Sequence, residues 1–334
     1  MGLCDDGCSG ARPFEVRRAR LLAVVMFTQS YGKSLLALLF TAAYLVVAPS
    51  AADAWCQSCS VTRGNITDCS QPCECRVDDG ELLLAWNRPC LSYSINEGGA
   101  DDLTREQVSE VLERSFSQWE NIRCGLEPLG FQIRETTEPA MCSNAEFVPD
   151  GGNANVVAFV GDWDERDLAR SAFAITTQWF GGRSGEIFGA DILVNEEFWD
   201  WTVCPDGGCP GTDRVDFENT MTHEAGHFLG LGHSSVLTST MSACALPGDT
   251  DKRELDADDI EGMCSIYPPS ALTRACDFDP PGGFDPTCEA IRPDCGCSVG
   301  SAPPEGSFVT LLLAAFALQV RRRKRAKAPP TPTA

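Results

Sequence analysis

The histidines constrain this chain more than any other feature. All three lie within eleven consecutive positions, in the stretch HEAGHFLGLGHS that starts at His223. A helix turns by about 100° per residue, so His223 and His227 project from one helix face, one turn apart. Gly230 reaches positive φ without strain, so the chain can leave the helix there and bring His233 back to the same point. The pattern predicts a helix that ends at a bend and three imidazoles that converge.

Three converging imidazoles predict a zinc site. Three neutral imidazoles on a tetrahedral ion leave one position for water, which is typical of catalytic rather than structural zinc. Zinc acidifies a bound water and polarises a carbonyl group. Glu224 is not a ligand in this pattern, so its carboxylate can accept the proton of the water and pass it to a leaving amine. The motif therefore predicts hydrolysis of peptide bonds, and a zinc-stabilised module without catalysis is the alternative.

The region from Trp55 to Gly306 is strongly acidic. It holds 44 acidic and 15 basic side chains, a net charge of −29, and Lys252 is its only lysine. Such a surface repels nucleic acid and anionic lipid, and it favours solubility and cation binding. We therefore expect no nucleic-acid partner. A solvated acidic surface without a specific partner is the alternative interpretation of the charge.

The N-terminal region predicts export. A lysine precedes the apolar run at 34–48, and the small-residue triplet Ala-Asp-Ala at 52–54 follows. These are the parts of a signal segment, so we assign 1–54 to targeting and expect cleavage after residue 54. Met26 is a neater start than the first residue, which makes 1–25 a candidate over-extension of the chain. An uncleaved anchor is the alternative, although the apolar run is short for a membrane span.

The cysteines predict an oxidising compartment. The chain has eighteen cysteines, and sixteen of them lie between Cys56 and Cys297, after the predicted signal segment. Cys56 and Cys59 form a CxxC pair, but no second pair at zinc-binding spacing follows, so disulfides are the favoured interpretation. Proximity in the sequence suggests three pairings: Cys204 with Cys209, Cys124 with Cys142, and Cys244 with Cys264.

Periodicity predicts two helices and a group of strands. A capping box at Thr104 precedes a helix with one apolar face, and a second helix begins at Asp256 and stops before Pro268. Between these helices, residues 156–195 alternate and cluster as strands do. The flanking regions are a Cys-rich lead-in at 55–82, a Pro-, Gly- and Cys-rich linker at 268–306, and an apolar run with a basic end at 307–334.

The complete motif resembles that of the metzincin zinc peptidases, and several features point to their matrixin branch. The third histidine is followed by Ser234, Met241 stands eight residues after His233, and LDADDIEGMCSIYP at 255–268 resembles the closing helix of that branch. WNRPCLSYSI resembles its opening strand. The resemblance covers residues 83–267.

This resemblance implies an α+β metzincin or zincin-like catalytic domain, with a twisted mixed sheet, an active-site helix and a C-terminal helix. It implies one zinc on His223, His227 and His233, with Glu224 as the general base. Met241 would form the apolar floor of the site, and the residues after it would help to line the specificity pocket. The stretch LARSAFAI at 168–175 resembles the edge strand that receives substrate by β-augmentation.

The chain also departs from the matrixin pattern. It lacks the histidines that a second, structural zinc requires, and it has no PRCGxPD switch. Ser242 replaces the usual aromatic residue after the methionine, which leaves the pocket open to interpretation. Calcium is plausible because the loops are acidic, although no EF-hand spacing is present.

The C-terminal residues resemble the sorting tails called Myxo-CTERM, with a cysteine, a spacer, an apolar run and an arginine cluster. The resemblance implies an exported protein, secreted or attached to the surface of a Gram-negative cell, that touches the membrane only through its signal and tail. A marginal membrane anchor is the alternative. We expect a monomeric zinc endopeptidase acting on proteins or peptides. The alternatives are an inactive zinc-stabilised adhesion module and a peptidase that cleaves peptidoglycan cross-links.

Overall fold

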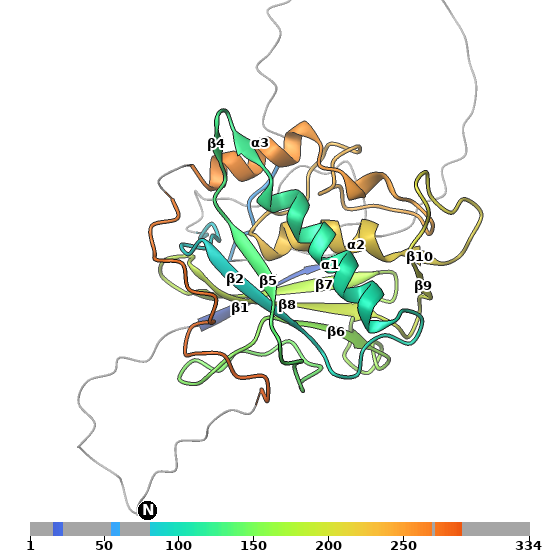
Figure 1. Ribbon diagram of the computed structural model, residues 1–334, viewed down its shortest axis with the longest axis horizontal. Coiled ribbons are helices and arrows are strands. Elements are labelled where there is room, and N and C mark those ends of the chain that lie inside the picture. The colour runs from blue at the N-terminus through green and yellow to red at the C-terminus, as the bar shows by residue number, and fades with distance from the viewer. Residues whose placement is uncertain (1–15, 23–54, 61–80, 269–270, 289–334) are drawn as a thin grey trace, which may run out of the picture. The chain divides into compact units, whose positions relative to one another are not determined.

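The computed structural model describes residues 16–22, 55–60, 81–268 and 271–288 (Figure 1). All of them belong to one compact unit. The predicted signal run, most of the Cys-rich lead-in and the C-terminal tail lie outside the described residues. In the part that is described, no helix has both the length and the apolar character needed to cross a membrane.

A six-stranded mixed sheet forms the centre of the fold, in the order β1-β7-β8-β6-β2-β5. Its strands are β1 (Val16–Leu22), β2 (Cys90–Ile95), β5 (Gln132–Glu135), β6 (Val156–Val160), β7 (Ala174–Gly181) and β8 (Ile187–Asn195). Four strands are parallel, β5, β2, β6 and β8, whereas β7 runs antiparallel to β8. Strands β6 and β8 are buried throughout, as expected of parallel strands covered on both faces.

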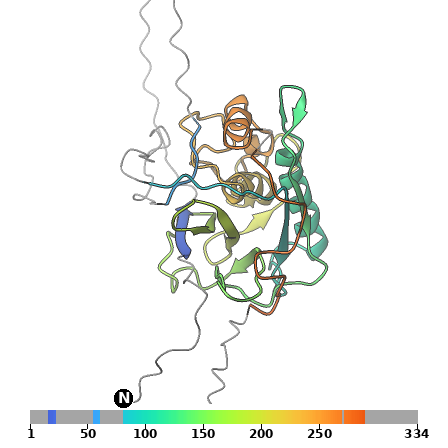
Figure 2. The same ribbon diagram turned by 90° about the vertical axis from the view of Figure 1, so that its left-hand side faces the viewer.

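In the described residues, three α-helices accompany the sheet: α1 (Arg105–Glu120), α2 (Phe217–Phe228) and α3 (Ala257–Ile266). Helices α1 and α2 pack against each other, and α2 contacts β7 and β8 (Figures 1 and 2). The expected capping box is present at Thr104. The Thr104 hydroxyl accepts a hydrogen bond from Gln107 N, and the Gln107 side chain accepts one from Thr104 N. The remaining short elements are β3 (Arg123–Cys124), β4 (Glu127–Pro128), β9 (Trp201–Thr202), β10 (Val215–Asp216) and the 3-10 helix η2 (Asp251–Arg253).

The main core lies between the sheet and the helices and contains a group of aromatic side chains. Phe116 of α1 stacks on Tyr93 of β2 and meets Phe228 of α2 edge to face. Trp119 is fully buried, and its indole donates to the carbonyl oxygen of Thr222 on α2 at 2.9 Å. These contacts fix α2 against α1, and α2 carries the histidine motif.

The expected substrate-receiving strand differs from the one that forms. We expected an edge strand at 168–175, but the strand is β7, which begins at Ala174. Residues before it are in turns, and Trp163 donates to the Ala169 carbonyl oxygen there. Strand β1 pairs antiparallel with β7, so β7 is not the edge in the described sheet. Because β1 lies within 1–54, the segment that we assign to targeting, removal of that segment would make β7 the edge strand.

Four disulfides join described cysteines, and only one of the three expected pairings is among them. Cys204–Cys209 is confirmed. The other two pairings are wrong, because the bonds are Cys90–Cys276, Cys124–Cys264 and Cys142–Cys288. The β3 strand that carries Cys124 lies beside α3 (Figure 1), which brings two cysteines 140 positions apart into contact. Cys56, Cys59 and Cys244 are also disulfide-bonded.

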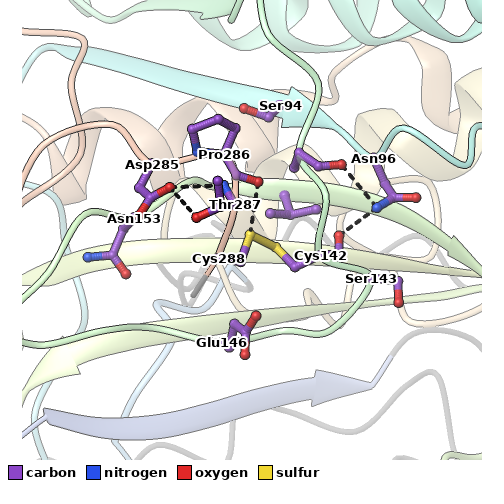
Figure 3. Close-up of a disulfide and its surroundings, with 12 residues drawn as sticks. Ser94, Asn96, Cys142, Ser143, Glu146, Asn153, Asp285, Pro286, Thr287 and Cys288 are labelled. Atoms are coloured by element: carbon purple, nitrogen blue, oxygen red, sulfur yellow. Dashed lines mark hydrogen bonds between the residues drawn. A yellow bond between two sulfur atoms is a disulfide. The ribbon is translucent and has the colours of Figure 1, made fainter. Parts of the chain in front are cut away.

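The expected linker at 268–306 is packed on the catalytic domain as far as residue 288 (orange to red in Figure 1). Two of the disulfides end in this segment, which we call the strap, residues 271–288. Figure 3 shows Cys142 and Cys288 joined beside Asn96, which donates to the Cys142 carbonyl oxygen at 2.6 Å. Backbone bonds add to them, because Met141 N donates to Pro286 O at 2.8 Å. The strap therefore has the composition of a linker, but tertiary contacts hold it on the domain.

Candidate metal centre

Helix α2 presents the first two histidines of the motif. Asp216 caps the helix by accepting from Asn219 N, and His223, Glu224 and His227 are all buried on α2. The helix ends at Phe228 with Leu229 as its C-cap, and the next residue, Gly230, has a φ of 100°.

The bend after α2 requires glycine for two reasons. A side chain rarely adopts the φ of Gly230, and a Cβ there would lie 2.9 Å from the carbonyl oxygen of Leu84. The chain then turns back and places His233 beside His227, with their Nε2 atoms 3.2 Å apart. The predicted bend and the return of the third imidazole are therefore present.

The three imidazoles fit a tetrahedral zinc ion. Their candidate ligand atoms all lie within 4.8 Å of one another. Two nitrogens bound to one tetrahedral zinc are about 3.4 Å apart, given zinc–nitrogen bonds of about 2.0–2.1 Å, and the 3.2 Å spacing is close to this. His223 Nε2 is buried and has no hydrogen-bond partner among the described residues. A cation bound between the three imidazoles would give this nitrogen the partner that it lacks.

Backbone carbonyl oxygens lie at the Nδ1 atoms of two of the histidine rings. His223 Nδ1 lies 2.6 Å from Thr240 O, and His227 Nδ1 lies 2.8 Å from Leu231 O. A carbonyl oxygen can only accept, so in the neutral rings these bonds place the proton on Nδ1 and leave Nε2 for a metal. The backbone therefore selects the metal-binding tautomer.

Burial keeps the rings neutral. Desolvation lowers the pKa of His227 to about 4 and lowers the pKa of His223 and His233 well below the ordinary value. The positive charge of Lys252 adds to the effect on each ring. Neutral imidazole is the form that binds metals.

Glu224 lies on α2 between the two helix histidines and is fully buried. Thr176 on β7 donates its hydroxyl to Glu224 Oε2 at 2.6 Å, whereas Oε1 has no partner among the described residues. Burial raises the pKa of Glu224 to about 7, and the Thr176 hydrogen bond opposes that rise. The carboxyl group is thus held by one oxygen and keeps the other for a further ligand.

Met241, the proposed floor of the site, lies next to α2. It is 1% exposed, and its sulfur packs against α2 at Gly226, between the two helix histidines. Asp259 of α3 holds the turn that carries Met241, since its carboxylate accepts from Thr240 N at 2.8 Å and from Met241 N at 3.0 Å. The apolar floor is therefore tied to the C-terminal helix.

Comparison with known proteins identifies the family to which this architecture belongs. A family model described as Matrixin matches residues 85–268, more than half of the chain. The chain belongs to the matrixin family. The α+β metzincin fold that its motif implies is thereby shown, and the mixed sheet with α2 and α3 is that catalytic domain.

Several curated metalloproteinases are similar to this matrixin. It is 31% identical to metalloendoproteinase 1-MMP of Arabidopsis thaliana over 190 residues, which are 57% of this chain and 46% of that protein. Metalloendoproteinase 2-MMP of the same plant is 30% identical over 188 residues, 56% of this chain and 43% of that protein. Interstitial collagenase of Bos taurus is 28% identical over 195 residues, 55% of this chain and 33% of that protein. The match thus spans less than half of each relative.

Sequence reasoning missed two polar residues of this matrixin site. Lys252 is 6% exposed, donates from Nζ to the Ser242 carbonyl oxygen and lies 3.4 Å from His223 Nδ1. Asp259 also completes the capping box at the start of α3. Being the only lysine in an acidic domain was the one available signal for Lys252.

Proposed function

We propose that the protein is a zinc-dependent metalloendopeptidase that hydrolyses peptide bonds of extracellular proteins. The single observation that carries the proposal is the position of Glu224. Its carboxyl group is buried on the same helix as two converging imidazoles and keeps one oxygen without a partner among the described residues. Membership of the matrixin family supports the same conclusion.

His223, His227 and His233 would hold the zinc, which supplies Lewis acidity when bound. Glu224 then accepts a proton at its free Oε1 and later gives it to the leaving amine. Thr176 keeps the carboxyl group oriented through the other oxygen. A pKa raised towards neutrality suits a group that must both take and return a proton near pH 7.

The proposal also covers the cellular location, the substrates and the oligomeric state of the enzyme. Four described disulfides fit an oxidising compartment, and with the predicted signal segment they support an exported protein. We propose protein or peptide substrates, a monomer, and release or surface attachment through the C-terminal tail in a Gram-negative cell. Calcium binding stays a prediction: the other candidate metal cluster in the described region includes Cys142 and Cys288, whose sulfurs bond to each other.

The test is Glu224→Ala in the full chain, assayed on casein and analysed for bound zinc. We expect zinc to stay bound and proteolysis to fall by about two to four orders of magnitude, because proton transfer is lost while the ligands remain. His233→Ala is the matched control and should lose zinc as well as activity. Full proteolysis by Glu224→Ala would exclude the mechanism. An inactive adhesion module instead predicts a wild type that binds zinc, melts on chelation and cleaves nothing.

A further inference from the structure

The start of the Cys-rich lead-in, residues 55–60, lies outside the matrixin match and yet contacts the metal centre. Ser58 N donates to the Gly230 carbonyl oxygen at 2.7 Å, and Gly232 N donates to the Cys56 carbonyl oxygen at 2.8 Å. Gln57 forms an antiparallel bridge with Leu231 between them. The lead-in is therefore paired with the three-residue bend, 230–232, that returns the third imidazole to the site.

The Ser58 side chain strengthens this pairing. Ser58 is 1% exposed, and its hydroxyl donates to the Leu231 carbonyl oxygen at 2.9 Å. The same carbonyl oxygen lies 2.8 Å from His227 Nδ1. One buried carbonyl thus accepts from a serine and from a ligand histidine, and both of its lone pairs are in use.

The lead-in is itself held firmly on its other side. Leu84 N donates to the Ser58 carbonyl oxygen at 2.8 Å, next to the start of the catalytic domain. Trp55 packs on α3, where a Cβ added to Gly262 would lie 3.0 Å from the indole Cγ. Cys56 and Cys59 are buried and disulfide-bonded. A segment anchored in this way can restrict the movement of the bend.

We propose that residues 56–58 are a positioning element of the metal centre and that Ser58 is its positioning residue. Through the Leu231 carbonyl, Ser58 fixes the ring of His227, and through the Gly230 carbonyl its backbone fixes the bend before His233. Groups that orient metal ligands typically alter metal affinity 10- to 100-fold when they are removed. The inference rests on the zinc site of the proposed function, and it assigns part of that site to a segment outside the family domain.

The test compares Ser58→Ala with Ser60→Ala in the full chain. The Ser60 hydroxyl also accepts a part-buried hydrogen bond, from Leu82 N at 2.9 Å, but among the described residues no hydrogen bond joins Ser60 to the bend. We expect Ser58→Ala to release zinc to a chelator about tenfold faster than wild type, with Ser60→Ala unchanged. Ser58→Thr keeps the hydroxyl and should restore slow release. A merely structural role would instead lower the melting temperature of the zinc-free protein and leave zinc release unchanged.

Hydrogen exchange on the wild-type protein tests the same inference without substitution. The amides of Ser58 and Gly232 should exchange at matching rates, and zinc should slow both, because they belong to one paired unit. Zinc release from Ser58→Ala at the wild-type rate, or zinc protection of Gly232 alone, would overturn the inference while leaving the peptidase intact. A wild type that binds no zinc would instead refute the proposed function.

Discussion

The sulfur of Met241 lies directly against Gly226, where a Cβ would come within 2.2 Å of it. The ring of Trp119 lies on the same side of this glycine, at 2.8 Å from the same point. The helix can therefore approach Met241 closely only because it lacks a side chain between His223 and His227, two of the proposed zinc ligands. The packing of α2 and the geometry of the histidine site therefore both depend on Gly226.

Gly226→Ala should accordingly push α2 away from Met241 and Trp119. Overpacking of a core usually costs about 1–3 kcal/mol, so we expect a lower melting temperature and weaker retention of zinc in dialysis. Gly161→Ala is the control, because its Cβ would meet nothing within 4 Å, and it should stay within about 0.5 kcal/mol of wild type. Equal stability of the two variants would contradict the packing role.

Gly230→Ala should cost more than backbone strain alone. The substitution forces a side chain into a φ of 100° and brings Cβ to 2.9 Å from the Leu84 carbonyl oxygen. Gly125→Ala is matched for the first effect only, since its φ is 69° and its Cβ has open space. We expect the control to lose about 1 kcal/mol of stability and to stay active, and Gly230→Ala to lose zinc as well. Zinc titration followed by calorimetry would separate them, and normal zinc affinity in Gly230→Ala would refute the prediction.

Asp191 on β8 should make stability depend on pH. Burial raises its pKa to about 7, against hydrogen bonds from Val156 N, the Trp179 indole and Glu146 N. An unfolded aspartate ionises near pH 3.9, so between about pH 4 and 7 the folded chain keeps a proton that the unfolded chain releases. The contribution of this group is therefore complete below about pH 4 and is lost as the pH rises to 7.

Asp191→Asn removes this ionisation. The free energy of unfolding of wild type relative to the variant should fall by an amount on the order of 2–4 kcal/mol between pH 4 and pH 7. Denaturant titrations at several pH values measure it, with the exposed Asp200→Asn as the control. A constant difference across this range would show that the carboxyl group is ionised throughout.

The strap should contribute stability through its long-range disulfide. Cys142 and Cys288 are 146 positions apart, whereas Cys204 and Cys209 are separated by 5. Loop-closure entropy assigns about 5 kcal/mol to the first bond and about 2 kcal/mol to the second. The paired variant Cys142→Ala/Cys288→Ala should therefore unfold at a lower temperature than Cys204→Ala/Cys209→Ala. Limited proteolysis should also cut its strap first, and a strap that stays resistant would argue against the covalent role.

The proposed metal ligands could be predicted from the sequence because their geometry is local. His223 and His227 are one helical turn apart, and the bend at Gly230 needs only the conformational freedom of that residue. Helix α3 and its cap at Asp256 followed from the same short-range rules. Met241 was placed only by its spacing from the third histidine in a recognised family pattern.

The sequence by itself determined the histidine motif and the use of cysteines in disulfides, since each depends on spacing or composition, whereas the α+β class followed from the family resemblance. Only the tertiary structure decided which cysteines pair, that the strap belongs to the domain, and that Ser58, Lys252 and Asp259 meet the site. Those contacts join residues many positions apart. They depend on how the sheet and helices pack, and no local periodicity records that packing.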